Sequence, residues 1–123
     1  MLVGNDHWHV PVMQVWDALE QDRTRLVTTS YVLLETFVLL QSRVGLQGVR
    51  AFAGDFVPRL EVNWVDQDLH DAGVAELLAL GRTGLSLVDC VSFCLMRQLG
   101  LRRALTVDAH FREQGFECLP ETA

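Results

Sequence analysis

The amino-acid sequence predicts an α/β protein in which helices flank both faces of a parallel β-sheet. Short segments with strand character are separated along the chain by one or two segments with helical character, and this order produces a parallel sheet. The length of 123 residues and the mass of 13.9 kDa suit one domain that spans residues 1–123. Half of the residues are hydrophobic, so one core can form without disulfide bonds or structural metal ions.

The first elements expected along the chain are a helix, a strand and a second helix. Apolar residues recur at helical spacing over 12–19, which predicts the first helix. Residues 25–30 form a short β-branched run that predicts a strand, and its last two residues are good N-caps for the next helix. Eight of the ten residues over 31–40 are apolar, so we expect this second helix to be buried on nearly all sides and to stop at Gly45.

A short helix, a second strand and a long helix follow. Apolar residues over 49–56 recur at the i, i+3, i+4, i+7 spacing of a short amphipathic helix. Over 60–64 apolar and polar residues alternate, which predicts a strand with one buried face. Residues 69–80 have helical character and are followed by Gly81, a typical helix terminator.

The last third of the chain predicts one more long helix and two strands. The helix covers residues 86–99 and ends at Gly100. Strands are expected over 103–107 and 116–120, with a short turn or helix around residues 110–111 between them. Parallel sheets of this kind place their functional sites at the carboxyl ends of the strands, so reactive side chains are expected there.

The charge of the chain argues against a generally basic surface. Ten arginines, no lysine and sixteen acidic residues give a formal net charge of −6. A protein that binds nucleic acid non-specifically carries an excess of positive charge instead. Contact with nucleic acid would therefore depend on local arginine patches, for which the candidates are Arg43, Arg50, Arg97, Arg102 and Arg103.

The sequence predicts a cytoplasmic protein. Its longest apolar runs are about ten residues, whereas a membrane-spanning helix needs ~18–20. No secretory signal pattern opens the chain. The three cysteines lack C-x-x-C spacing, and Cys90 and Cys94 lie in an apolar helical pattern, so we expect them to be reduced thiols in the core.

Glu35 is the first of three acidic residues in unusual surroundings. It lies in the middle of the apolar segment 31–40, and none of its neighbours at i±3 and i±4 is a cation. A carboxylate buried there without a partner would take up a proton, pair with an arginine from elsewhere in the chain, or bind a metal ion. The alternative is that the helix turns one narrow stripe to water.

The other two acidic residues stand at expected helix starts. Asp89 lies three residues after Ser86, which is the spacing of a capping box. Asp108 directly follows the strand predicted over 103–107 and so stands at a carboxyl end. Each has a purely structural alternative as a helix cap. A cleft that collected Glu35, Asp89 and Asp108 would suit Mg²⁺ or Mn²⁺ and would support phosphodiester hydrolysis.

Three blocks of sequence occur in a defined order along the chain, namely TTSYVLLETF (28–37), GLSLVDCVSFCLM (84–96) and ALTVDAHFREQGFECLP (104–120). They resemble PIN-domain proteins, and VapC-type toxins in particular, and the resemblance extends over roughly residues 5–120. It implies a PIN-like fold and a metal-dependent endoribonuclease that is held inactive by a protein antitoxin and forms a homodimer. By the positions of the motifs, it implies that Glu35, Asp89 and Asp108 help to bind Mg²⁺ or Mn²⁺ and to cleave RNA.

The chain departs from the PIN pattern at its N-terminus. The family opens with a hydrophobic strand that ends in a metal-binding Asp, whereas here residues 5–9 resemble a segment beyond the first helix. The first strand and its Asp are therefore expected to be missing, and Asp6, in a polar stretch beside His7 and His9, does not replace that Asp. Three explanations compete: a start assigned too far downstream or a truncated gene, a degenerate protein, or a relative that completes its sheet differently.

This departure leaves a second function open. A catalytically silent PIN-like module would bind an antitoxin or RNA without cutting it, and its binding would not depend on metal. A chain that lacked a central strand could also fold poorly, because neighbouring strand edges would stay unpaired. The four histidines do not supply a different metal site, since none of them forms an H-E-x-x-H or comparable zinc pattern. For His110, the alternatives are a capping or surface role, a contact with substrate, and the orientation of Asp108.

Overall fold

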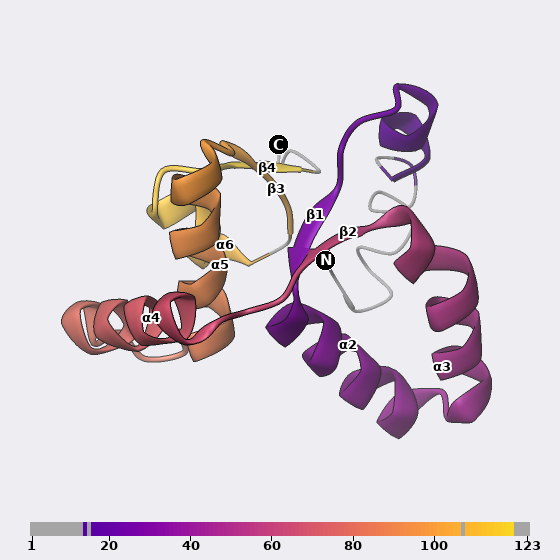
Figure 1. Ribbon diagram of the computed structural model, residues 1–123, viewed down its shortest axis with the longest axis horizontal. Coiled ribbons are helices and arrows are strands. Elements are labelled where there is room, and N and C mark those ends of the chain that lie inside the picture. Colours follow the sequence, from indigo (N-terminus) through magenta and orange to yellow (C-terminus); the bar gives the residue numbers. More distant parts are fainter. Residues whose placement is uncertain (1–13, 15, 107, 120–123) are drawn as a thin grey trace. The chain divides into compact units, whose positions relative to one another are not determined.

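The computed structural model describes residues 14, 16–106 and 108–119, and the predictions that concern residues 1–13, 15, 107 and 120–123 lie outside them (Figure 1). The chain divides into two compact units, Met1–Trp64 and Val65–Ala123. Each unit has its own helices, its own pair of strands and its own buried side chains. The two units are described separately.

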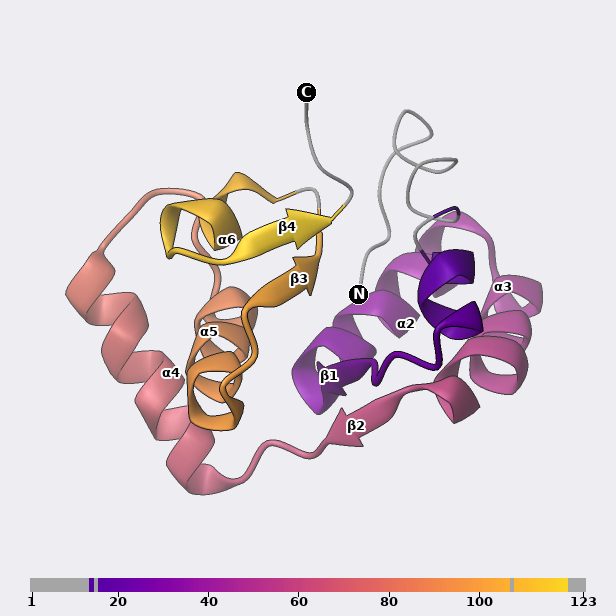
Figure 2. The same ribbon diagram turned by 90° about the horizontal axis from the view of Figure 1, so that it is seen from above.

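The first unit contains a helix–strand–helix order that follows the sequence prediction. Residues 16–21 are helical. The elements that follow are β1 (Val27–Thr29), α2 (Ser30–Arg43), α3 (Leu46–Ala51), the π-helical turn η1 (Phe52–Phe56), the 3-10 turn η2 (Val57–Arg59) and β2 (Glu61–Asn63). Strands β1 and β2 pair in parallel, with Thr28 opposite Val62 (Figure 2). The segment predicted as one short amphipathic helix is thus divided between α3 and η1.

Helix α2 begins where the sequence predicts but is not buried as the sequence suggests. The hydroxyl of Thr29 accepts a hydrogen bond from the Val32 N–H at 3.1 Å and so caps the helix start. Only Leu33 and Thr36 are buried in the whole helix, while Leu34 is 64% exposed. The expectation of burial on nearly all sides is therefore wrong. An apolar run without periodicity does not say which of its sides has a neighbour to pack against.

Aromatic side chains form the core of the first unit. Trp16 and Phe52 are buried, and the rings of Trp16 and Phe56 lie 5.3 Å apart between centroids. Phe52 also packs edge-on against Phe37 of α2 at 5.2 Å. The aromatic residues of the predicted amphipathic segment 49–56 therefore pack in the core of their own unit.

The second unit contains two long helices and a second pair of parallel strands. Its elements are α4 (Gln67–Leu80), α5 (Leu87–Leu99), β3 (Arg103–Leu105), α6 (Ala109–Glu113) and β4 (Glu117–Leu119). Strands β3 and β4 pair with Ala104 opposite Cys118. Helices α4 and α5 both end at a glycine in the left-handed conformation, Gly81 and Gly100, as the sequence predicts.

The core of the second unit lies between α5, α6 and the strands. Its buried members are Cys90, Phe93, Met96, Ala104 and Phe116. The Phe93 ring lies 5.8 Å from that of Phe116, which stacks on it, and 4.8 Å from that of Phe111, which meets it edge-on. The side of α5 that carries Phe93 thus holds α6 and β4 in place.

The strands of the described residues form two separate two-stranded parallel sheets, β1–β2 and β3–β4. The parallel direction agrees with the prediction from the alternation of strands and helices. That prediction also joined the strands into one continuous sheet, whereas the described strands pair within each unit. Within the described residues, no helix has both the length and the hydropathy that crossing a bilayer requires.

Candidate functional site

Asp89 stands in the first turn of α5, where it closes a capping box. The Ser86 hydroxyl accepts a hydrogen bond from the Asp89 N–H at 3.1 Å, and an Asp89 carboxylate oxygen accepts one from the Ser86 N–H at 3.5 Å. This reciprocal pair orients the carboxylate at the positive end of the helix dipole. Asp89 therefore does have the capping role that was its structural alternative, and its side chain is half-buried at the N-terminus of α5.

Asp108 stands at the start of α6. It follows β3, and its Oδ1 accepts a hydrogen bond from the His110 N–H at 2.9 Å, which makes it the N-cap. Its own N–H donates to the buried Thr106 hydroxyl at 3.0 Å. The carboxylate is therefore held between the end of the strand and the start of the helix, as predicted for the carboxyl end of a strand.

The starts of α5 and α6 lie beside each other in the second unit. The His110 Nε2 atom lies 3.7 Å from the position that a Cβ would occupy on Gly84, in the loop that leads into α5. Phe111, the next residue of α6, packs on Phe93 of α5. These contacts bring the N-terminus of α5, with Asp89, and the N-terminus of α6, with Asp108, to the same region of the unit.

Glu35 belongs to the other unit, on α2. Its side chain is exposed, and it has no ion pair with any residue that the structure describes. The alternative in which the helix turns a polar stripe to water describes the position of Glu35 within its unit. Glu35 thus lies on a helix surface of the first unit, whereas Asp89 and Asp108 lie at helix N-termini of the second unit.

No group of three or more His, Cys, Asp or Glu side chains among the described residues is arranged to hold a metal ion. The chemistry of the predicted set nevertheless fits a hard cation, because Mg²⁺ and Mn²⁺ prefer carboxylate oxygens. Neither Glu35 nor Asp108 has its charge neutralised by an ion pair with a described residue. The assembly of three ligands stays a prediction.

Sequence reasoning missed a polar cluster next to the N-termini of α5 and α6. Arg82 forms a salt bridge with Glu113, with 2.9 Å between Nη1 and Oε2, and the same oxygen lies 3.3 Å from Nδ1 of His110. The i,i+3 spacing of His110 and Glu113 on a helix could have indicated their contact. Nothing in the sequence pairs Arg82 with them, since it comes from the loop before α5.

Cys90 is a core residue, as predicted, whereas Cys94 is only half-buried. Cys90 and Cys118 are buried, and the Cys94 thiol donates a hydrogen bond to Glu76 at 2.9 Å. Burial, that hydrogen bond and the negative charge of Glu76 raise the pKa of Cys94 to about 12. Burial also raises the pKa of Cys90 and of Cys118. All three thiols are therefore protonated at neutral pH and are unsuited to nucleophilic or metal-binding roles.

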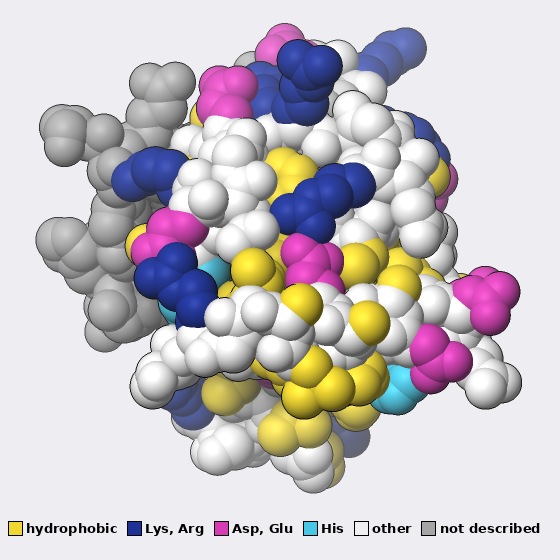
Figure 3. Space-filling model, turned by 90° about the vertical axis from the view of Figure 1, so that its left-hand side faces the viewer, with side chains coloured by type: hydrophobic (Ala, Val, Ile, Leu, Met, Phe, Trp, Pro, Cys, Tyr) yellow, Lys and Arg dark blue, Asp and Glu magenta, His cyan; other side chains and the backbone are white. Residues whose placement is uncertain are grey.

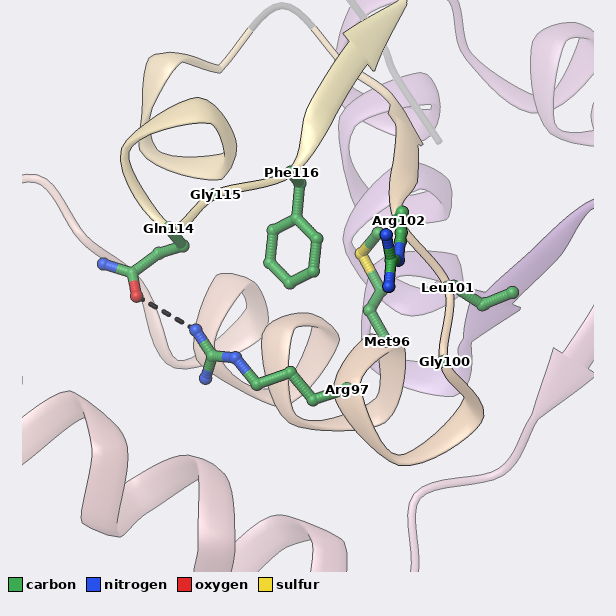
Figure 4. Close-up of a pocket in the computed structure, with 8 residues that line it drawn as sticks. All are labelled: Met96, Arg97, Gly100, Leu101, Arg102, Gln114, Gly115 and Phe116. Atoms are coloured by element: carbon green, nitrogen blue, oxygen red, sulfur yellow. Dashed lines mark hydrogen bonds between the residues drawn. The ribbon is translucent and has the colours of Figure 1, made fainter.

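A hollow of about 360 Å³ lies at the amino ends of β3 and β4, away from the strand ends that lead to Asp108. Figure 4 shows the Phe116 ring pointing into it between Arg97 and Arg102. Arg97 bonds to Gln114 at 3.0 Å and also pairs with Glu76. Arg97 thus has a structural role in this unit, and none of the predicted carboxylates lines the hollow.

The remaining arginine candidates are exposed. Arg43, Arg50, Arg102 and Arg103 have no ion pair with residues that the structure describes. On the face shown in Figure 3, arginine and carboxylate side chains are interspersed around hydrophobic ones. This mixture agrees with the acidic balance of the whole chain, and it leaves single arginines available for phosphate contacts.

Comparisons with known proteins give two kinds of match. The chain is 34% identical over 98 residues to the 23S rRNA-specific endonuclease VapC20 of Mycobacterium tuberculosis, in the strains CDC 1551 / Oshkosh and ATCC 25618 / H37Rv, and the match covers 78% of this chain and 75% of that protein. The crystal structure of M. tuberculosis VapC20, a sarcin-ricin loop cleaving toxin, superposes with a TM-score of 0.78 at 29% identity over 91% of this chain and 85% of that one. No protein-family model matches the chain.

Proposed function

Because this chain belongs to the VapC-type toxin ribonucleases of the PIN-domain family, we propose that it is a metal-dependent endoribonuclease that cuts a structured ribosomal RNA. Family membership makes it an endoribonuclease toxin. The metal, the target and the roles of individual residues are the parts that we propose. The target follows from the relatives, which are named for 23S rRNA and for the sarcin-ricin loop.

We propose that Glu35, Asp89 and Asp108 hold Mg²⁺ or Mn²⁺. When bound, such an ion activates water and offsets the charge that develops on the phosphate. Asp89 and Asp108 would present carboxylates that backbone hydrogen bonds already orient, so little side-chain freedom is lost on binding. Glu35 would add a carboxylate that no described cation neutralises, and with Asp89 it would ligate or orient the metal and its water.

The observation that carries this proposal is the placement of Asp89 and Asp108 at two adjoining helix N-termini of one unit. The N-terminus of α5 favours negative charge, including the charge of an RNA phosphate. A carboxylate pair that gathers a cation at such a place would also attract phosphate oxygens to that cation. Hydrolysis of a phosphodiester is the reaction that this combination supports best.

The proposal includes two protein partners. As a VapC-type toxin the chain is expected to bind a protein antitoxin, and we propose that it acts as a homodimer. Leu34 and Val38 support the second point, because they are 64% and 56% exposed one turn apart on α2. Neighbouring apolar side chains that face water are typical of a surface that another protein covers.

The direct test is cleavage of an RNA stem-loop with the sarcin-ricin sequence by the purified chain, with Mn²⁺, Mg²⁺ or chelator, monitored on a sequencing gel. We expect cleavage at a defined bond with metal and none with chelator. Asp89→Asn should lower kcat by about a hundredfold or more, since a neutral amide replaces a metal ligand next to the developing charge.

A matched control distinguishes loss of the site from loss of a helix cap. Asp66 caps α4 by accepting a hydrogen bond from the Leu69 N–H at 2.8 Å, so Asp66→Asn makes the same chemical change at another cap. We expect this variant to cleave within about twofold of the parent chain. Equal losses in both variants would contradict a specific role for Asp89.

A silent binding module is the second candidate, and one observation favours it: Asp89 and Asp108 already have structural roles at the starts of α5 and α6. Such a module would bind the stem-loop or an antitoxin equally well with metal and with chelator. It would not cut RNA under any of these conditions. Binding without cleavage, by a chain with a sharp thermal unfolding transition, would therefore select this alternative over the nuclease.

A further inference from the structure

Three side chains from two segments of the second unit form a chain of polar contacts that the proposed mechanism does not use. Arg82 holds Glu113 through a salt bridge at 2.9 Å, and Glu113 Oε2 lies 3.3 Å from Nδ1 of His110. The imidazole is mostly covered, with 21% of its side-chain surface exposed. His110 is therefore fixed in orientation by an acidic neighbour that is itself fixed.

The contact with Glu113 determines what the other ring nitrogen of His110 can do. A carboxylate only accepts hydrogen bonds, so Nδ1 must carry the proton in this contact. In the neutral imidazole Nε2 then has a lone pair and acts as an acceptor. The cluster thus presents a hydrogen-bond acceptor at a defined position.

The Nε2 atom is open to a ligand. Among the described residues it has no hydrogen-bond partner, and it is not one of their buried unpaired side-chain atoms, so it is not enclosed. A side chain on Gly84 would cover it, because a Cβ at that position would lie 3.7 Å from Nε2. Gly84 has a φ of +83°, so the backbone itself favours glycine where a side chain would reach the imidazole.

We propose that His110 contacts the RNA directly, with Nε2 accepting a hydrogen bond from a ribose 2′-hydroxyl or a base N–H, and that Glu113 and Arg82 are positioning residues. The inference rests on the proposed function. His110 is two residues beyond Asp108 and adjoins the loop that leads to Asp89, so RNA bound at these carboxylates lies within its reach. A 2′-hydroxyl donor would also distinguish RNA from DNA.

The test uses two substitutions that each retain a polar group at one ring nitrogen. The amide oxygen of glutamine can lie near the Nε2 position of histidine and accept a hydrogen bond there, whereas the amide of asparagine lies near Nδ1. Binding of a fluorescently labelled sarcin-ricin stem-loop is measured by anisotropy in the Asp89→Asn background, where no cleavage interferes. We expect His110→Asn to weaken binding by roughly two- to tenfold, the effect of one lost hydrogen bond, and His110→Gln to retain most of it.

The positioning pair is tested by Glu113→Gln, which weakens the hold on Nδ1, with Glu117→Gln as the control. Glu117 is an exposed residue of β4, so this variant loses the same charge away from the cluster. We expect weaker RNA binding for Glu113→Gln only, with thermal midpoints close to that of the parent for all variants. A midpoint that fell together with binding would instead indicate a purely structural cluster and overturn the proposal.

Other outcomes are equally decisive. Unchanged binding in both His110 variants, equal losses in both, or a loss in His110→Gln alone would overturn the contact through Nε2. If the parent chain neither binds nor cuts RNA, the proposed function itself fails, which is a different result from normal cleavage with inert His110 variants. Stem-loops with single 2′-deoxy substitutions identify the donor: a 2′-hydroxyl contact is lost at one position in the parent but not in His110→Asn, and a base contact is insensitive to all of them.

Discussion

At the scale of single residues, the candidate site uses side chains that also shape the backbone. Asp89 and Asp108 both cap helices, so the structural and the functional interpretations of these residues are not exclusive. A cap fixes the direction of its carboxylate through hydrogen bonds to backbone N–H groups, and a metal ligand needs the same fixed direction. His110 is fixed in a comparable way by Glu113 rather than by the backbone.

The cysteines give a residue-scale prediction with a defined pH dependence. The reactive form of a thiol is the thiolate, and the pKa of Cys94 is raised to about 12, with Cys90 and Cys118 also raised by burial. Below such a pKa the thiol stays protonated, so labelling of the folded protein at pH 8 should be slow and should accelerate as the pH rises. All three thiols should react rapidly in urea.

Ellman's reagent measures both rates by absorbance, and the urea-unfolded chain is the control for the total number of thiols. A cysteine that reacted in the folded protein as fast as in urea would contradict the protonated, covered state. The environment of Cys94 also depends on the Glu76–Arg97 pair, which holds the carboxylate that accepts its hydrogen bond.

At the scale of elements, the packing of α4 on α5 depends on a missing side chain. A Cβ on Gly73 of α4 would lie 2.5 Å from Cγ2 of Val91 and 3.3 Å from its Cα. Val91 is fully buried and β-branched, so it cannot turn aside. The glycine therefore permits a close approach of the two helices that any larger residue would push apart.

Gly73→Ala is expected to lower the free energy of unfolding by about 1 kcal/mol. Overpacking costs about 1–3 kcal/mol, and the higher helix propensity of alanine returns up to about 1 kcal/mol of that. Urea denaturation followed by circular dichroism measures the difference. Gly54→Ala serves as the control, because a Cβ there meets no atom within 4 Å. A Gly73→Ala protein as stable as the Gly54→Ala protein would show that the helices can shift without cost.

Helix α2 shows where element-scale prediction from sequence fails. Its start at Ser30 and its end near Gly45 follow from local signals, the Thr29 cap and the glycine with a φ of +83°. Its burial depends on what lies against it, and the run of apolar residues over 31–40 carries no periodicity to indicate this. Leu33 and Thr36 are buried and Leu34 is not, although all three lie in that run.

At the scale of the whole molecule, the acidic balance and the exposed apolar residues bear on association. With a net charge of −6, binding of RNA must rely on local arginines, together with the cation that we propose. The exposed pair Leu34 and Val38 favours a protein partner at α2. A second copy of the chain is the partner that we propose there.

Light scattering after size exclusion should therefore give about twice 13.9 kDa for the parent chain. Val38→Asp places a charge in the apolar pair and should reduce the mass toward that of one chain, because burying an unpaired carboxylate is costly. Leu78→Asp changes another exposed apolar residue, 77% exposed on α4, and should leave the mass unchanged. A parent chain that runs as a monomer would contradict the homodimer.

Local sequence signals sufficed to predict the order of the elements, the start of α2 and the ends of α4 and α5, the parallel direction of the strands, the family, and the candidate residues Glu35, Asp89 and Asp108. These depend on local signals, such as the Ser86 capping box and the glycines that end α4 and α5, which act over a few residues. The side of α2 that is buried, the pairing of Arg97 with Glu76, and the placement of Arg82 and Gly84 beside His110 and Glu113 became visible only in the folded structure. These contacts join residues distant in sequence or depend on which surfaces meet, so no local pattern encodes them.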